Sequence, residues 1–234
     1  GIQSIVRKFK KLNLPFSQFS EKIAIHINDT HPAFCVPELM RILIDEENIS
    51  WDEAWEITKS SISYTNHTIL SEAMEKWDIN IFEFLFKDLY KIIQRINEQF
   101  INEMSQKGYF RDKIDRLAPI GDGKVQMAFL AIYGSFSVNG VARLHTEIIK
   151  NETLSEWYGI WPEKFSSKTN GVTPRRWLKM ANPELSDFIT ELLGSSDWIT
   201  NLDELEKLKS FSSENSVIER FMEIKKTIFF MCPS

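Results

Sequence analysis

Cysteine is scarce in this sequence, with only Cys35 and Cys232 among its 234 residues. Two cysteines make no disulfide framework, and their spacing is not that of a Cys-x-x-Cys motif. This usage favours a reducing compartment, so we expect a cytoplasmic location. The N-terminal segment lacks the uninterrupted apolar core of a secretory signal, and no apolar run approaches the roughly 20 residues that cross a bilayer. We therefore expect no membrane partner.

Positive charge is not in excess, because 28 Lys and Arg stand against 33 Asp and Glu and give a net charge of −5. Nucleic-acid binding depends on clustered positive charge, so we expect no nucleic-acid partner. The sequence also lacks a P-loop, a GxGxxG motif and a GxSxG motif. The 43% hydrophobic and 26% charged residues are typical of a globular protein and exclude a disordered one.

The four histidines do not have the spacing of metal ligands, so we expect no metal site. His26 lies within an apolar alternation and is expected to be structural. His145 lies in a helical segment and is expected to be a surface or packing residue. His31 and His67 lie in polar clusters and are candidates for a binding site.

Proline and glycine are absent between Pro37 and Gly108, which favours helix throughout that stretch. Pro37 is suited to open a helix, and Ser50 with Glu53 forms a capping box for a second one. A long helix is predicted from Ile79, with apolar residues at helical spacing up to position 104 and an end at Gly108.

Strand signals are fewer than helix signals. Residues 23–27 alternate between apolar and other side chains, which predicts a strand with one buried face. The remaining expectations are one or two helices over 125–150, irregular structure over 151–168, a helix from Asn182 to Gly194 and a short helix over 202–210. The sequence therefore predicts a predominantly helical α/β protein.

The first polar cluster runs from Asn28 to Pro32 and follows the predicted strand. Ligands of open α/β sheets bind beyond the carboxyl ends of strands, and Asp29, His31 and an amide suit a polyhydroxylated ligand. The alternative is a polar turn whose aspartate caps a helix.

The second cluster, Tyr64 to Thr68, is a polar island between two apolar helical segments. His67 is suited to donate to a ligand hydroxyl or to stabilise developing charge. The alternative is a histidine whose hydrogen bonds are satisfied by the local backbone.

The third cluster extends from Lys168 to Trp177. Arg175 and Arg176 fall in the first turn of a predicted helix, where the helix dipole disfavours cations. A bound anion would offset this cost, and pairing with carboxylates of another domain is the alternative.

The clusters together resemble one family. The segments are INDTHPAFCVPELMRILID, WDEAWEITKSSISYTNHT, SVNGVARLH and KTNGVTPRRWL. They look like the α-glucan phosphorylases, which include the glycogen, starch and maltodextrin phosphorylases. The blocks occur in the family's order and at its spacing, and the resemblance covers roughly residues 4–225.

The resemblance implies a GT-B glycosyltransferase architecture, in which two lobes with Rossmann-like sheets enclose the active site. It implies phosphorolysis of the terminal α-1,4-linked glucosyl unit of a glucan by inorganic phosphate, giving α-D-glucose 1-phosphate with retained configuration. The implied cofactor is pyridoxal phosphate on a lysine of the C-terminal lobe, and the implied parent enzyme is a homodimer.

By the same resemblance, the expected catalytic residues are His67, Asn170 and Asp29. The family places the backbone carbonyl of His67 near the charge that develops on the glucosyl ring, and it uses Asn170 to bind hydroxyls of that sugar. The other expected substrate contacts are His31, Val141, Glu72 and Glu75, and Trp177 is expected to approach the cofactor.

We expect residues 1–169 to be the C-terminal part of the N-terminal, glucan-binding lobe and 170–234 to be the start of the C-terminal lobe. The pyridoxal lysine motif is missing, and the last residues, TIFFMCPS, do not resemble the family. We therefore expect an internal fragment that is inactive by itself. The alternatives are a truncated helical module without activity and another GT-B glycosyltransferase.

Overall fold

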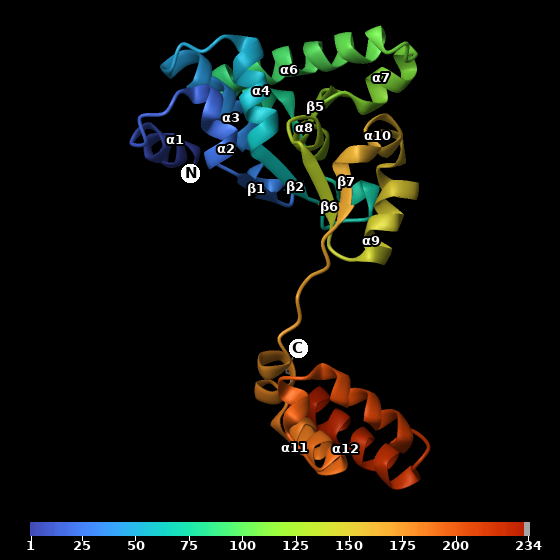
Figure 1. The fold of residues 1–234 in the computed structure, drawn as a ribbon. Coiled ribbons are helices and arrows are strands. Elements are labelled where there is room, and N and C mark those ends of the chain that lie inside the picture. Colours follow the sequence, from blue (N-terminus) through green and yellow to red (C-terminus); the bar gives the residue numbers. More distant parts are fainter. Residues whose placement is uncertain (232–234) are drawn as a thin grey trace. The chain divides into compact units, whose positions relative to one another are not determined.

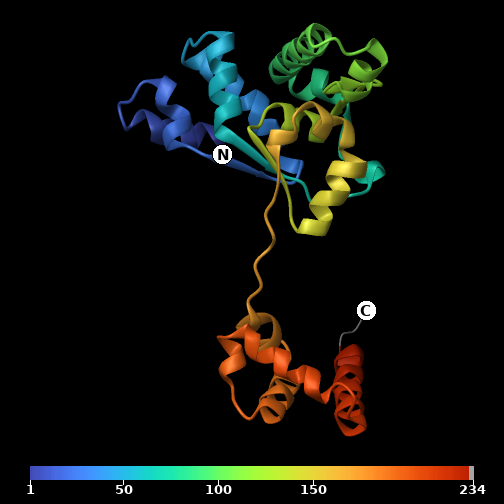
Figure 2. The ribbon, with the colours of Figure 1, turned by 45° about the vertical axis from the view of Figure 1, so that its right-hand side comes forward.

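The computed structural model describes residues 1–231, without the side chains of Ser71 and of 228–231. Cys232 and the last residues of TIFFMCPS lie outside this description. The chain divides into two compact units, Gly1–Asn170 and Gly171–Ser234. Residues 168–173, which have no regular secondary structure, join them (Figure 2). In the described part of the chain, no helix has the length and apolar character needed to cross a membrane.

The first unit is built on a four-stranded sheet in the order β1-β2-β6-β7 (Figure 1). All neighbouring strands are parallel. The strands are β1 (Ile25–Asn28), β2 (Ile62–Thr65), β6 (Ser137–Gly140) and β7 (Phe165–Ser167). Because they are parallel and in register, their carboxyl ends all lie at one edge of the sheet.

The two faces of this sheet differ in polarity. One face presents Ile27, Tyr64, Val138 and Phe165, which are register partners across the four strands and are buried. The other face carries small or polar side chains such as those of Ser63 and Asn139, which are partly exposed. Side chains alternate along a strand, so the apolar set faces the core and the polar set faces away from it.

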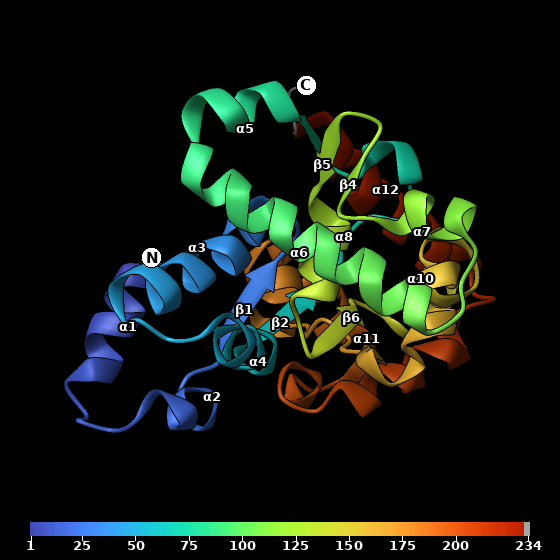
Figure 3. The ribbon, with the colours of Figure 1, turned by 90° about the horizontal axis from the view of Figure 1, so that it is seen from above.

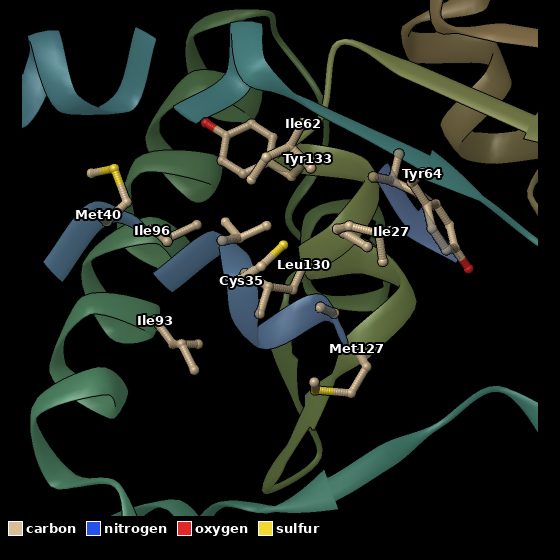
Figure 4. Packing of buried hydrophobic residues seen from close by; sticks show 14 of the residues in the cluster. Ile27, Cys35, Met40, Ile62, Tyr64, Ile93, Ile96, Met127, Leu130 and Tyr133 are labelled. Carbon is tan, nitrogen blue, oxygen red and sulfur yellow. The ribbon is translucent and has the colours of Figure 1, made fainter. Parts of the chain in front are cut away.

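Helices cover the apolar face. Figure 4 shows Ile27, Ile62 and Tyr64 of the strands together with Leu130 and other helical side chains. The helices of this unit are α1 (Ile2–Lys10), α2 (Phe19–Lys22), α3 (Cys35–Arg41), α4 (Trp51–Ser61), α5 (Ile79–Leu85), α6 (Lys87–Gln106), α7 (Arg111–Leu117), α8 (Met127–Tyr133), α9 (Arg143–Ile148) and α10 (Ser155–Ile160). The long helix α6 runs beside α3 (Figure 3). Ser50 caps α4 by accepting a hydrogen bond from the Glu53 amide, as the capping box predicts.

A small antiparallel sheet lies apart from the main one. It has the order β3-β5-β4, with β3 at Lys76–Asp78, β5 at Lys124–Gln126 and β4 at Ile120–Gly121. Because β3 follows the second polar cluster, its pairing with β5 anchors the chain that leaves that cluster.

The second unit is helical. It contains a π-helical turn at Arg175–Met180, α11 (Pro183–Leu193), a 3-10 segment at Leu202–Phe211 and α12 (Asn215–Met231). The Asn182 side chain accepts from the Leu185 amide at the start of α11, and Gly194 ends that helix at φ 68°. Both ends of α11 were predicted from these residue types.

Several expectations about secondary structure are wrong. The sequence predicts at least one strand and locates only the first, whereas β2 and β7 form in segments expected to be polar or irregular, and β6 forms where helix was expected. The long helix predicted from Ile79 is interrupted at Phe86, which has φ −137° and ψ 44°. There the rings of Phe82 and Phe86 both contact Phe34, with centroids 5.2 and 5.3 Å away. Tertiary packing of the aromatic rings thus accompanies the break.

A half-buried charge lies at the amino-terminal edge of the main sheet. Lys164 directly precedes β7, and its Nζ donates hydrogen bonds to the carbonyls of Ile132 (3.1 Å) and Tyr133 (3.5 Å) at the end of α8. Terminal helix carbonyls lack intrahelical partners and carry partial negative charge, so the ammonium caps α8. Burial lowers the pKa of Lys164 to about 8, and the ammonium of Lys59 acts in the same direction.

We predict that Lys164→Met changes the pH dependence of stability. A lysine of the unfolded chain keeps its proton up to pH 10.5, whereas Lys164 of the folded chain loses it at about 8. Between these values the unfolded chain binds more protons. The wild-type free energy of unfolding therefore rises with pH, relative to the variant, by about 3 kcal/mol.

Denaturant unfolding at about pH 7 and about pH 10 measures this difference, with Met at the exposed Lys225 as a control. The control should follow the wild type at both pH values. If the free energy of unfolding had the same pH dependence in the wild type and in Lys164→Met, the lowered pKa of Lys164 would be contradicted.

Candidate functional site

The carboxyl edge of the parallel sheet gathers residues from all three polar clusters. Asp29 follows β1, His67 lies two residues after β2, Val141 follows β6, and Asn170 lies three residues after β7. The parallel register therefore brings these four residues, the first and last of which are 141 positions apart in the sequence, to one edge. Open α/β sheets bind their ligands at this edge.

Backbone hydrogen bonds continue past the strand ends and hold the loops together. The amide of Asp29 donates to the carbonyl of Thr65 (3.0 Å), and the amide of Asn66 donates to that of Asn139 (2.9 Å). Asp29 has φ 64°, a left-handed conformation that Asp and Asn tolerate better than most residues. Its carboxylate accepts from the amide of Thr30 (2.6 Å). A polar turn is therefore present, but Asp29 does not cap the following 3-10 helix His31–Phe34, whose N-cap Thr30 has no side-chain cap hydrogen bond.

Glu75 connects the loop after β1 with the segment that precedes β3. Its Oε2 accepts a hydrogen bond from the hydroxyl of Thr30 (2.7 Å) and lies 3.4 Å from Nδ1 of His31. Its Oε1 accepts from Nε1 of Trp77 (2.8 Å). The structure thus brings His31 and Glu75 together, as two of the expected substrate contacts.

His67 is exposed, and its ring is hydrogen-bonded to a residue of the neighbouring strand β1. Its Nε2 pairs with Oδ1 of Asn28, the last residue of β1. The ring is therefore held by a neighbouring strand, not by the local backbone that was the alternative. Because the ring remains exposed at the sheet edge, it is accessible to a ligand.

The tip of β2 buries polar atoms that lack partners in the described residues. These atoms are the hydroxyl of Tyr64 and both side-chain atoms Oδ1 and Nδ2 of Asn66. Burial raises the pKa of Tyr64, and the carboxylates of Asp29 and Glu75 act in the same direction. Buried polar atoms without partners cost free energy, so this tip is suited to donate and accept hydrogen bonds with a bound molecule or water.

Val141 and Asn170 are joined directly. The amide of Asn170 donates to the carbonyl of Val141 (3.0 Å), and the amide of Lys168 donates to that of Gly140 (3.0 Å). These bonds extend the β6–β7 pairing beyond the strands. The carboxamide of Asn170 itself is exposed.

The remaining expected site residues are exposed. Glu72 lies in the 3-10 turn Ser71–Ala73, close in sequence to Glu75. Trp177 lies in the second unit, in the π-helical turn, and is 62% exposed. In the described chain, no ion pair joins Arg175 or Arg176 to a carboxylate.

Lys164 is not suited to hold pyridoxal phosphate. A Schiff base requires a lysine amine that is free of other partners. The half-buried Lys164 has its Nζ bound to two carbonyls at the end of α8, at the opposite edge of the sheet. The exposed Trp177 follows Arg175 and Arg176 in the sequence and offers an aromatic ring beside two cations. A role of Trp177 beside the cofactor stays a prediction.

Sequence reasoning missed a polar network on the open face of the sheet. The hydroxyl of Thr65 lies 2.6 Å from Nε2 of His26 and donates to Oδ1 of Asn139 (2.8 Å). His26 therefore has the structural role expected of it. Thr65 lies in the second polar cluster, but nothing local marked its contact with Asn139, which depends on the pairing of β2 with β6. Within the part of the chain that the structure describes, no cluster of His, Cys, Asp and Glu is arranged to hold a metal.

The parallel sheet and its polar edge agree with a family match. Residues 1–228 match the family described as carbohydrate phosphorylase. The chain therefore belongs to the carbohydrate phosphorylase family.

Its relatives within that family are glycogen phosphorylases. Glycogen phosphorylase 2 of Dictyostelium discoideum is 47% identical over 229 residues, which cover 96% of this chain and 23% of the relative. Glycogen phosphorylase of Bacillus subtilis is 47% identical over 227 residues, covering 96% and 28%. The human brain form is 43% identical over 239 residues, with the same coverage as the Bacillus subtilis protein. The chain thus spans about a quarter of the length of these relatives.

We predict that Gly140→Ala disturbs this edge. A Cβ at Gly140 would lie 2.5 Å from Oγ1 of Thr146 and 2.7 Å from Nδ1 of His145, so α9 would have to move away from the strand end. We expect the free energy of unfolding to fall by about 1–3 kcal/mol.

The matched control is Gly159→Ala, in α10, where no heavy atom lies within 4 Å of the added Cβ. This helical substitution should leave stability unchanged or raise it by about 0.5–1 kcal/mol. Thermal or denaturant unfolding compares the two variants. Equal stability of both would show that β6 and α9 are not packed as described.

Proposed function

We propose that this chain forms part of an α-1,4-glucan phosphorylase. The enzyme transfers the terminal α-1,4-linked glucosyl unit to inorganic phosphate and releases α-D-glucose 1-phosphate with retained configuration. The observation that carries the proposal is the convergence of Asp29, His67, Val141 and Asn170 at one sheet edge, in a chain of the phosphorylase family. The family match favours this activity over that of a nucleotide-sugar glycosyltransferase.

The polar edge suits the binding of a neutral sugar. Hexose hydroxyls both donate and accept hydrogen bonds, and the edge offers carboxylates, a carboxamide and an imidazole beside the apolar side chain of Val141. Asn170 is proposed to bind hydroxyls of the terminal glucosyl unit, and Val141 to form an apolar wall. Asp29, His31, Glu72 and Glu75 are proposed to line the adjoining pocket.

His67 is proposed to act through its backbone and its ring. A carbonyl dipole that is fixed before the reaction stabilises positive charge on the glucosyl ring without reorganisation. The bond from Nε2 of His67 to Asn28 orients the residue against β1. The ring is proposed to contact the primary hydroxyl of the sugar.

The remaining parts of the proposal concern the whole enzyme. We propose a GT-B architecture in which the first unit belongs to the glucan-binding lobe and the second unit begins the C-terminal lobe. Pyridoxal phosphate, held by a lysine of the C-terminal lobe, supplies proton transfer to the substrate phosphate. Trp177 is proposed to lie near it. A homodimeric, cytosolic enzyme is proposed from the same family and from the cysteine usage of the chain.

The test is a chimera in which this chain replaces the matching segment of the Bacillus subtilis relative. That segment is 47% identical to the chain over 227 residues, which favours correct assembly. We expect release of glucose 1-phosphate from maltopentaose and inorganic phosphate. A folded chimera without phosphorolysis would contradict the proposed function.

In the active chimera, we predict that His67→Ala and Asn170→Ala each lower kcat/KM at least about 100-fold, because each removes a prearranged polar contact to the sugar. Ala at the exposed Glu98 of α6 is the control and should retain turnover. If either site variant produced glucose 1-phosphate at the wild-type rate, the proposed role of that residue in the sugar site would be contradicted.

A further inference from the structure

His145 lies against the Val141 loop of the carboxyl edge. It stands in the first turn of α9, four residues after Val141. The amide of Val141 donates a hydrogen bond to its Nδ1 (3.1 Å). The ring also packs on the end of β6, since a Cβ at Gly140 would lie 2.7 Å from the same nitrogen. His145 is thus fixed against the backbone that carries a proposed wall of the sugar pocket.

This contact determines the tautomer of the ring. A nitrogen that accepts from an amide carries the lone pair, so the proton of the neutral imidazole resides on Nε2. Nε2 is therefore a donor. It is buried, and the described residues offer it no hydrogen-bond partner within bonding distance.

His67 is the residue whose groups act on this ring besides burial. Burial lowers the pKa of His145. The backbone of His67 opposes this effect, as a nearby carbonyl oxygen does, and the ring of His67 adds to it. His145 therefore contacts the loop after β6 through Nδ1, while its Nε2 is buried without a partner among the described residues.

Further backbone bonds pass from these loops to their neighbours. The carbonyl of Val141 accepts from the amide of Asn170 (3.0 Å), and the carbonyl of Asn139 accepts from the amide of Asn66 (2.9 Å). A displacement of the His145 ring would therefore shift the segment that carries His67 and the segment that carries Asn170.

We infer that His145 is a positioning residue of the sugar site. Its Nδ1 holds the Val141 loop, and its buried Nε2–H is available to the backbone carbonyl of His67. The inference rests on the proposed function for its effect on turnover, whereas the tautomer and the Val141 contact are properties of this chain alone.

The first test measures the chain without substrate. In the chain labelled with nitrogen-15 at histidine, ring-nitrogen NMR shifts should show an unprotonated Nδ1 and a protonated Nε2 for His145 at neutral pH. Hydrogen exchange at the Val141 amide should be slow in the wild type and in His145→Asn, because the Asn oxygen replaces Nδ1. It should be faster in His145→Gln, whose polar atoms replace Nε2. A proton on Nδ1 would overturn the inference, as would a Val141 amide exchange rate that is the same in the wild type and in both variants.

The second test measures turnover in the active chimera. We expect kcat to fall about 10-fold in His145→Asn and in His145→Gln, and further in His145→Phe, with KM for maltopentaose changed less than kcat. The matched control is Leu144→Ala, at the neighbouring position of α9, which is 74% exposed and should behave as the wild type.

The outcomes separate the inference from the proposed function. An inactive unsubstituted chimera counts against the proposed function, while the NMR shifts and the Val141 exchange still decide the placement of His145. Full turnover in folded His145→Phe would overturn the positioning role. If His145→Phe does not fold, the Asn and Gln variants, each keeping one of the two contacts, decide it.

Discussion

The parallel register of four short strands is the constraint on which the rest of the first unit depends. Hydrogen bonding aligns Asn28, Thr65 and Asn139 as neighbours. It continues beyond the strands through the amides of Asp29 and Asn66. A slip by one residue would reverse the faces of a strand and move its following loop. The same pairing therefore sets the core and the positions of Asp29, His67, Val141 and Asn170.

The polar and apolar faces of the sheet are kept apart by this register. The buried face is continuous across β1, β2, β6 and β7, while the other face carries the hydrogen bonds of His26, Thr65 and Asn139. Parallel sheets are usually covered on both faces. The partly exposed polar face is consistent with a chain that spans about a quarter of its relatives' length.

The site combines rigid backbone with exposed polar side chains. Loops at strand ends are held by extended β pairing and by Glu75, whereas the ends of His67 and Asn170 remain accessible. Such an arrangement can bind a neutral sugar with little reorganisation, because its dipoles are placed before the ligand arrives. Membership of the carbohydrate phosphorylase family supports the proposal that this edge binds a sugar.

Local signals in the sequence determined the ends of α11, the cap of α4, the first strand and the three polar clusters, because each depends on neighbouring residues. The long motifs also identified the family. Tertiary structure alone decided that β2, β6 and β7 are strands and that α5 and α6 separate at Phe86. It also placed the ring of His145 against the Val141 loop. These features depend on partners far away along the chain, and short-range periodicity contains no information about such partners.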